Sequence, residues 1–340
     1  MHMRIIITGH TGFKGSWMSA LLATLGHEVH GLSHEIVNES HYKFAELSRF
    51  LASDSKIDVR DPLSVGKHFL SIKPDFVVHL AAQAFVREGF RKPFETFDTN
   101  FRGTINVIKA CKEAEISNLL VITSDKVYRE SATSHSFCEN DPLGGKDPYS
   151  ASKAAADLAT QSFATQADFI QISIARAGNV IGGGDFGQER LIPDLFRAQV
   201  NNTPAIIRNP NAIRPWQHVL DCLDGYICIM NNMYSRRISD VWNIGPHEED
   251  FITVMNICEK ASSYFRNPTI FNVSKKPELT MKESQSLRLD STKISQDLGW
   301  MPKLNTDSAI EWTFNWYEGL LKGNSVSKLT ENQINRYLKM

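Results

Sequence analysis

Two side chains suited to proton transfer, Tyr149 and Lys153, stand four residues apart in the segment YSASK. On a helix this spacing puts both side chains on one face. A cation about 4 Å from the phenol, at an effective dielectric of about 20, is worth on the order of 4 kcal/mol. Free tyrosine titrates near about 10, so the ammonium is expected to lower the tyrosine pKa by about two to three pH units. The pair therefore predicts a proton-transfer catalyst.

A second set of reactive side chains, Thr123 to Lys126 (TSDK), closes an apolar strand upstream of that helix. It offers hydroxyls, a carboxyl group and an amine within four residues. Such a run after a strand is also a common turn with a solvated lysine. Because it shares a predicted crevice edge with YSASK, we favour a catalytic role for Ser124, Asp125 and Lys126.

Glycines recur at spacings of three in TGHTGFKG, between the first strand and the first helix. Gly9, Gly12 and Gly15 permit a tight turn in which backbone N–H groups approach a pyrophosphate at the helix N-terminus. Thr11 and Phe13 lie within the same loop. The spacing differs from GxGxxG, and by itself it also fits a glycine-rich turn without a cofactor.

The identity of the dinucleotide depends on the region after the second strand. Glu35 lies about 20 residues beyond the glycine loop, where a carboxylate accepts from the adenosine ribose and excludes a 2′-phosphate. This favours NAD over NADP, whereas the neighbouring His34 would suit the phosphate. Asp58 and Val59 are candidates for the adenine edge and ring, and a turn aspartate at a strand end is the alternative.

Short β-branched runs alternate with helical patterns along the first half of the chain. This cadence predicts an α/β fold, a Rossmann-type doubly wound parallel sheet with helices on both faces. Strands are expected at residues 3–8, 28–33, 57–59, 76–80, 119–124, 169–176 and 241–244. Ligands bind beyond the carboxyl ends of such strands. One crevice should thus be lined by Thr8, Gly9, Leu80, Ala81, Thr123, Ser124 and Arg176.

The alternation of strand and helix patterns ends at about residue 181, and beyond it glycines and prolines separate shorter elements. We expect two discontinuous domains: residues 1–180 plus about 219–245 binding NAD, and a smaller, mostly helical lobe of residues 181–218 plus about 246–340. The last helix is expected to begin near Thr306. The polar segment beyond Gly323 carries no clear pattern.

Composition excludes several functional classes. The net charge of -1, with scattered basic residues, argues against nucleic-acid binding. The sequence has no apolar run long enough to cross a membrane. Five cysteines without metal-ligand spacing are expected to be reduced thiols, which together with the absence of a leader pattern predicts a soluble cytoplasmic protein. His79 and His218 read as packed core residues rather than metal ligands.

The glycine loop, HLAAQ at 79–83, TSDKVY at 123–128 and YSASK together resemble the extended short-chain dehydrogenases/reductases. More narrowly, TGHTGFKGSW, LGGKDPYSASKAAAD, RAGNVIGGGDF and IRPWQHVL resemble the CDP-glucose 4,6-dehydratases. The likeness is dense over residues 3–245 and thin afterwards, and SHEIVNESHYKF replaces the expected proline pair after Gly31. The sequence therefore also allows a substrate with another nucleotide or with an N-acetylated sugar.

The resemblance implies a role for each matching residue. Ser124 would bond the sugar 4-OH beside Tyr149, and Lys153 would bind the cofactor ribose. As hydride leaves sugar C4 for the nicotinamide, Tyr149 takes the hydroxyl proton, and the resulting ketone acidifies the C5 proton. Lys126 is the candidate base for that proton, and a neutral Asp125 would protonate the departing C6 hydroxyl. Hydride then returns to C6, so the NAD should stay tightly bound.

The same resemblance completes the predicted site and its partners. The cofactor set is Gly9, Thr11, Gly12, Phe13, Gly15, Asp58, Val59, Leu80, Ala81, Ala82, Gln83, Thr123, Tyr149, Lys153 and Arg176. Arg190 and Arg214 would face the substrate diphosphate, with surface salt bridges as the alternative, and Asn179 would reach phosphate or sugar. Helices near 95–113 and 148–166 would pair in a homodimer, or be buried within one subunit.

The expected product is a 4-keto-6-deoxy nucleotide sugar of the kind used in deoxysugar and lipopolysaccharide O-antigen biosynthesis. Dehydration of GDP-, TDP- or UDP-sugars is the first alternative. An epimerase or reductase of the same superfamily is the second, and Asp125 followed by Lys126 argues against it. A noncatalytic dinucleotide-sensing regulator is the third, and it would have little use for Ser124, Tyr149 and Lys153.

Overall fold

A seven-stranded parallel sheet forms the centre of the computed structural model, which describes residues 2–130, 135–165, 170–265, 271–274 and 287–340. The strand order is β11-β6-β5-β4-β1-β2-β3, so the chain reverses direction across the sheet between β1 and β4. All six pairings are parallel, as the sequence pattern predicts. The strands are β1 (Arg4–Thr8), β2 (Glu28–Ser33), β3 (Ser53–Lys56), β4 (Phe76–His79), β5 (Asn118–Ile122), β6 (Gln171–Ala177) and β11 (Val241–Ile244).

Helices cover both faces of this sheet, because successive strand side chains point to opposite sides. Ile5 and Ile7 of β1 belong to the core under α1 (Phe13–Thr24) and α9 (Val219–Arg236). Ile6 belongs to the separate core under α3 (Pro62–Ile72) and α6 (Gly103–Glu113). Helix α7 (Pro148–Ala164) packs beside α6. Buried on both faces, the strands are nearly continuous runs of apolar residues.

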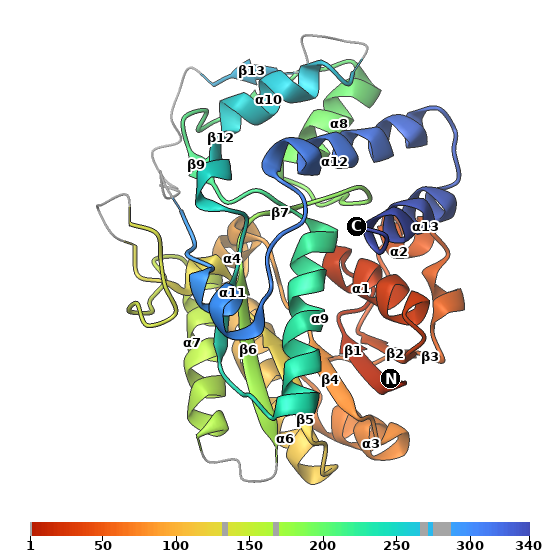
Figure 1. Cartoon of the computed structure of the whole chain (residues 1–340), viewed down its shortest axis with the longest axis vertical. Coiled ribbons are helices and arrows are strands. Elements are labelled where there is room, and N and C mark those ends of the chain that lie inside the picture. Colours follow the sequence, from red (N-terminus) through yellow and green to blue (C-terminus); the bar gives the residue numbers. More distant parts are fainter. Residues whose placement is uncertain (1, 131–134, 166–169, 266–270, 275–286) are drawn as a thin grey trace.

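A second layer of elements gathers beyond the carboxyl ends of the strands, at the top of Figure 1. Helix α11 (Thr292–Leu298) lies lower, against α9 and the edge strand β11 of the central sheet. The helices of the second layer are α8 (Leu191–Asn201), α10 (Val254–Ser262) and α12 (Thr306–Leu321). Three two-stranded pairs join them: β7 (Val180–Ile181) with β10 (Gln217–His218), β9 (Ile213–Arg214) with β12 (Ile252–Thr253), and β8 (Ala205–Ile207) with β13 (Phe271–Val273). The short helices α2 (His41–Phe44), α4 (Val86–Arg91) and α5 (Pro93–Phe97) complete the ligand edge of the sheet.

Two predicted strand boundaries were wrong. The third strand occupies residues 53–56 rather than 57–59, because β3 alternates exposed and half-buried polar side chains (SDSK) and lacks the apolar signature used to find strands. Strand β5 ends at Ile122, two residues before Ser124. The start of β6 was expected at residue 169, which lies outside the described residues.

The segment after Gly323 forms a further helix, α13 (Val326–Tyr337), so α12 is not the last one. Its buried side chains, Val326, Ser327, Thr330, Ile334 and Tyr337, mix apolar and polar groups, which is why the apolar pattern of the sequence did not reveal the helix. The helix lies beside α1 and α2. The Tyr337 hydroxyl donates to Asp221 Oδ1 on α9 at 2.6 Å, and Thr330 Oγ1 bonds His41 Nε2 at 2.8 Å.

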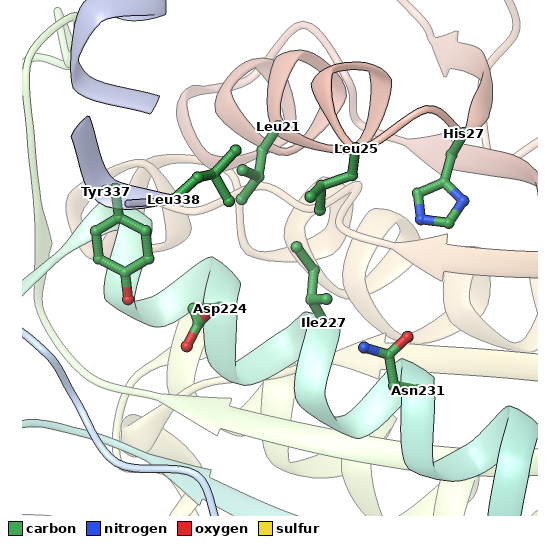
Figure 2. Close-up of a pocket in the computed structure, with 8 residues that line it drawn as sticks. All are labelled: Leu21, Leu25, His27, Asp224, Ile227, Asn231, Tyr337 and Leu338. Carbon is green, nitrogen blue, oxygen red and sulfur yellow. The ribbon is translucent and has the colours of Figure 1, made fainter. Parts of the chain in front are cut away.

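Figure 2 shows how the end of α13 meets α1 and α9 around a surface pocket of about 310 Å³. Leu21 and Leu25 of α1 face Ile227 of α9, and Tyr337 and Leu338 close one side. The pocket lies at the C-terminal end of α1. It is therefore separated by the length of that helix from the glycine loop.

Within the described residues, none of the helices is both long and apolar enough to cross a membrane. The same part of the chain contains no cluster of three or more potential metal ligands. All five cysteines are free thiols. His79 is buried between the hydroxyls of Thr8 (2.7 Å) and Thr104 (3.0 Å), which confirms the expected core position.

Candidate active site

The glycine loop is shaped by close backbone approach. Gly9 adopts φ +74°, and a Cβ there would lie 2.7 Å from the backbone of Ala81. A Cβ on Gly15 would lie 2.1 Å from the Gly9 carbonyl oxygen. Side chains at these two positions would separate β1 from the loop after β4 or push α1 away from the turn. The loop therefore needs glycine for the spacing that the sequence pattern predicts.

The N-terminus of α1 has donors to offer an anion. Gly12 is the N-cap, no side chain accepts a hydrogen bond from the first turn, and that turn contains no acidic residue. Free N–H groups and the positive end of the helix dipole attract phosphate. Gly12 is exposed, so its backbone is accessible. These features fit a bound pyrophosphate, which the first turn of α1 would hold.

The adenosine side differs from expectation at Asp58. Its carboxylate is engaged by Arg60, with Nη2 at 2.6 Å and Nε at 3.0 Å, and hydrogen bonding to Arg60 lowers its pKa against the opposing effect of burial. Val59 is buried against Gly103. The Glu35 side chain is 61% exposed, while its carbonyl oxygen accepts from Thr11 Oγ1 at 2.9 Å. Asp58 therefore occupies the alternative position, a paired turn aspartate.

The loop after β4 forms the wall opposite the glycine loop. Leu80 N donates to the Thr8 carbonyl at 3.1 Å, and Ala81 N donates to Thr8 Oγ1 at 3.2 Å. Ala82 is half-buried in the same loop. The Gln83 side chain is hydrogen-bonded within the wall, where its Nε2 donates to Thr96 Oγ1 at 2.9 Å. Gln83 thus shapes this wall by holding the start of the next helical segment.

The tyrosine and lysine of YSASK lie at the start of α7, which Asp147 caps by accepting from Ser150 N. Both side chains are buried. Lys153 Nζ donates to the Ile122 carbonyl at the end of β5, 2.7 Å away. That bond fixes the ammonium at the carboxyl edge of the sheet, next to Thr123 and Ser124.

The protonation behaviour of this pair differs from the expectation. Burial raises the pKa of Tyr149 to about 12, against a lowering contribution from the Ser124 hydroxyl. Burial lowers the pKa of Lys153 to about 7, and the charge of Lys14 lowers it further. For both groups the largest cause of the shift is the cost of burying the charged form. The predicted depression of the tyrosine pKa is therefore wrong for the protein without its cofactor.

Asp125 and Lys126 follow Ser124 in the single turn η3 (Asp125–Val127). The Ser124 hydroxyl donates to Asp125 Oδ1 at 2.9 Å, whereas Asp125 Oδ2 is buried without a hydrogen-bond partner among the described residues. Burial raises the pKa of Asp125, against the attraction of Lys126. This direction agrees with the neutral acid expected from the sequence. Buried polar atoms normally have a hydrogen-bond partner, so this carboxyl oxygen is suited to bond a ligand.

The predicted substrate residues surround this turn. Arg214 is buried, and its charge lowers the pKa of Asp125. Arg190 lies 4.7 Å from the ring centroid of Phe85 and pairs with Asp185 at 3.0 Å. Asn179 is half-buried where the chain leaves β6. Arg190 therefore forms an ion pair, which was the alternative to a substrate contact. Its charge also lowers the pKa of Tyr149.

Arg176 lies behind the crevice rather than in it, contrary to its assignment as a cofactor residue. Its guanidinium donates to Asp157 through Nε (2.9 Å) and Nη2 (2.7 Å). Nη1 donates to the Tyr128 hydroxyl at 2.9 Å and to the Glu139 carbonyl at 3.0 Å. The side chain is 1% exposed. With these bonds made in the core, the guanidinium joins α7 to the sheet.

Two residues of this region were not assigned a role from the sequence. Lys14, the second residue of α1, donates to the Tyr226 hydroxyl on α9 at 3.1 Å. Tyr226 is completely buried. The signal was present in the glycine loop itself, because a lysine in TGHTGFKG is a charge next to a predicted phosphate site. Tyr226 had no such signal, since it lies on the apolar face of a helix.

Comparison with known proteins agrees with this geometry. Residues 5–245 match the NAD dependent epimerase/dehydratase family. The chain is 36% identical over 347 aligned residues to the CDP-glucose 4,6-dehydratase of Salmonella typhimurium, which covers 98% of this chain and 96% of that protein. The chain therefore belongs to the NAD dependent epimerase/dehydratase family.

Solved structures share the fold at low sequence identity. A UDP-glucose-4-epimerase from Stenotrophomonas maltophila, with bound NAD and formylated UDP-arabinopyranose, aligns with a TM-score of 0.84 at 19% identity over 95% of this chain and 100% of the other. A dTDP-glucose 4,6-dehydratase from Bacillus anthracis in complex with NAD has a TM-score of 0.80 at 19% identity, over 97% and 99%. The family and the glycine loop together identify NAD as the cofactor.

Proposed function

We propose that this chain is an NAD-dependent nucleotide-sugar 4,6-dehydratase, a lyase that converts CDP-glucose to CDP-4-keto-6-deoxyglucose and water. The observation that carries the proposal is the buried Asp125 Oδ2, which has no hydrogen-bond partner in the described part of the chain and lies next to Lys126, on the same crevice edge as Tyr149 and Lys153. An epimerase needs no acid and base at that turn. The 36% identical Salmonella typhimurium relative, a CDP-glucose 4,6-dehydratase, supports the reaction and the substrate.

Bound NAD supplies a hydride acceptor that later returns the hydride. The chain's own residues move the protons. Tyr149 accepts the 4-OH proton while Ser124 bonds the same hydroxyl, and Lys153 holds the cofactor ribose. Lys126 then removes the C5 proton, and Asp125, whose pKa burial raises, protonates the leaving C6 hydroxyl. An acid must carry its proton before it acts, and burial favours that protonated form of Asp125.

The second layer is proposed to bind the nucleotide. Its candidates are Asn179, Arg190 and Arg214, with the guanidinium groups suited to bidentate phosphate contacts. We assign residues 1–180 with about 219–245 to the NAD-binding domain and the rest to a substrate lobe. The pairing of β11 with β6 supports that division, since it brings a late segment into the central sheet.

A homodimer and a role in deoxysugar biosynthesis, as for lipopolysaccharide O-antigen, are the finer parts of the proposal. Exposed apolar side chains on α5 and α7 support the dimer, because Phe94 is 90% and Leu158 is 54% exposed. Large apolar groups concentrated on neighbouring helices are typical of association surfaces. A cytoplasmic location follows from the free thiols and stays a prediction.

The test is incubation of the purified protein with CDP-, TDP-, GDP- and UDP-sugars deuterated at C4. We expect CDP-glucose to lose one water, by mass, and the deuterium to appear on the new C6 methyl group. Solvent hydrogen should enter at C5. Inversion at C4 without water loss would instead identify an epimerase, and turnover of a different nucleotide sugar alone would replace the substrate assignment.

A further inference from the structure

Lys14, a half-buried basic residue of the site, has no role in the mechanism above. Lys14 extends from the first turn of α1 toward α9, where its Nζ is 3.1 Å from the Tyr226 hydroxyl and 5.5 Å from the centroid of that ring. A lysine with its ammonium held below the surface carries a desolvation cost. A purely solvated lysine would not be fixed between two packed helices.

The charge of Lys14 reaches the reacting groups from the opposite wall of the crevice. It lowers the pKa of Lys153 on α7, which Asp157 opposes, and it lowers the pKa of Asp125 in the turn η3. Burial lowers the pKa of Lys14 itself, the Cys222 thiol and Asp125 oppose that effect, and Arg190 adds to it. Arg190 in turn lowers the pKa of Tyr149, so the basic side chains of Lys14 and Arg190 both act on the reacting groups.

The hydride must pass beside these reacting groups. Tyr149 takes the proton of the hydroxyl whose carbon gives up the hydride, so the acceptor ring has to lie beside Tyr149. The oxidised nicotinamide ring carries one positive charge and the reduced ring carries none. A fixed neighbouring cation therefore destabilises the oxidised form relative to the reduced form.

We propose that Lys14, anchored by Tyr226, is a residue that raises the tendency of the bound coenzyme to accept hydride, and that it thereby promotes oxidation of the sugar at C4. In that step the C4–H electron pair moves to the nicotinamide and the hydroxyl proton moves to Tyr149. The inference rests on the proposed function only in requiring that NAD binds beside Tyr149.

The test separates charge from shape in the full-length protein. Dissociation constants of NAD⁺ and NADH are measured separately, without sugar, by titration calorimetry. In Lys14→Met the ratio of the NAD⁺ constant to the NADH constant should fall roughly tenfold, because the repulsion of the oxidised ring is gone. Lys14→Arg, which keeps the charge, should stay within about twofold of the original ratio.

Lys67→Met is the matched control, because Lys67 is exposed on α3 away from the crevice, and its ratio should equal that of the unaltered protein. If Lys14→Met does not fold, Lys14→Gln gives the same comparison. Equal changes in both constants would overturn the inference, since Lys14 would then only shape the loop. Failure of the unaltered protein to bind either form would instead overturn the proposed function.

Discussion

Arg176 and Asp157 form a two-pronged ion pair in the core, with Nε to Oδ2 at 2.9 Å and Nη2 to Oδ1 at 2.7 Å. Neither side chain is more than 1% exposed. Asp157 Oδ2 also accepts from Thr123 Oγ1 at 2.9 Å. This pair joins α7, which carries Tyr149 and Lys153, to β6 and to the end of β5.

Removing one member of the pair should be costly. Asp157→Ala leaves the Arg176 guanidinium buried without its counter-ion, and we expect it to lower the free energy of unfolding by about 3–5 kcal/mol. Urea denaturation followed by circular dichroism measures the change. The double variant Asp157→Leu/Arg176→Met should lose less than Asp157→Ala, and an equal or larger loss would contradict a burial penalty.

Asp125→Asn should stabilise the protein at neutral pH while abolishing water loss. Burial raises the pKa of Asp125 in the folded state above its ordinary value, so the folded chain retains a proton that the unfolded chain releases. Stability is then lost as pH rises from about 3.9 through the folded-state pKa. Asparagine never ionises. We expect a gain in the free energy of unfolding at pH 7 that shrinks toward zero near pH 4.

Urea titrations of Asp125→Asn at several pH values measure this difference. Asp297→Asn is its control, because Asp297 is exposed on α11 and should change stability by less than about 0.5 kcal/mol. A gain for Asp125→Asn that does not vary between pH 4 and 7 would rule out ionisation as its cause.

Lys126→Met should separate the half-reactions. Sugar-dependent formation of bound NADH, followed by absorbance, is expected to continue because Tyr149, Ser124 and Lys153 are intact. Hydrogen exchange between C5 and solvent should stop, and product formation should fall by about 10²–10⁴-fold through loss of the base. Unchanged product formation would remove Lys126 from the mechanism.

Tyr337→Phe should loosen the C-terminal helix. The lost hydroxyl donates to the buried Asp221 carboxylate at 2.6 Å, and hydrogen bonds to charged groups are worth about 1.5–3 kcal/mol. A lower melting temperature in calorimetry and faster amide exchange in α13 are expected. Tyr234→Phe, at a 47% exposed position of α9, should have no such effect.

Leu158→Glu should convert a dimer to a monomer. Leu158 is 54% exposed on α7, and a carboxylate placed in an apolar interface is strongly unfavourable. Light scattering after size exclusion gives the mass. Leu63→Glu, at a 74% exposed position of α3, should leave the mass unchanged. A monomeric unaltered protein would refute the proposed dimer.

The sheet and the catalytic helix were predictable because their signals are local. β1 is an apolar run bounded by the glycine loop, and the spacing of Tyr149 and Lys153 places both on one helical face. A Cβ at Gly9 or Gly15 would clash with nearby backbone atoms, so only glycine fits there. The glycine spacing in the sequence therefore predicted this loop correctly.

The remaining features depend on contacts distant in sequence. Arg176 looked like a crevice residue because strand ends line the ligand edge, and only the buried Asp157 explains its position. The third strand was predicted a few residues too late because β3, at the edge of the sheet, has polar side chains that alternate between half-buried and exposed. The pKa of Tyr149 was misjudged because the attraction of Lys153 was counted without the desolvation of both groups.

Helix α13 also affects the order in which the chain folds during its synthesis. His41 bonds Ser16 of α1 at 2.8 Å on one side and Thr330 at 2.8 Å on the other, 289 residues further along the chain. During synthesis on the ribosome, the support of the phosphate-binding turn stays open until residues 326–337 have emerged. The dinucleotide half, although encoded first, reaches its native packing late, because a nascent chain interrupted before that point lacks the Thr330 partner of His41 and the Tyr337 partner of Asp221.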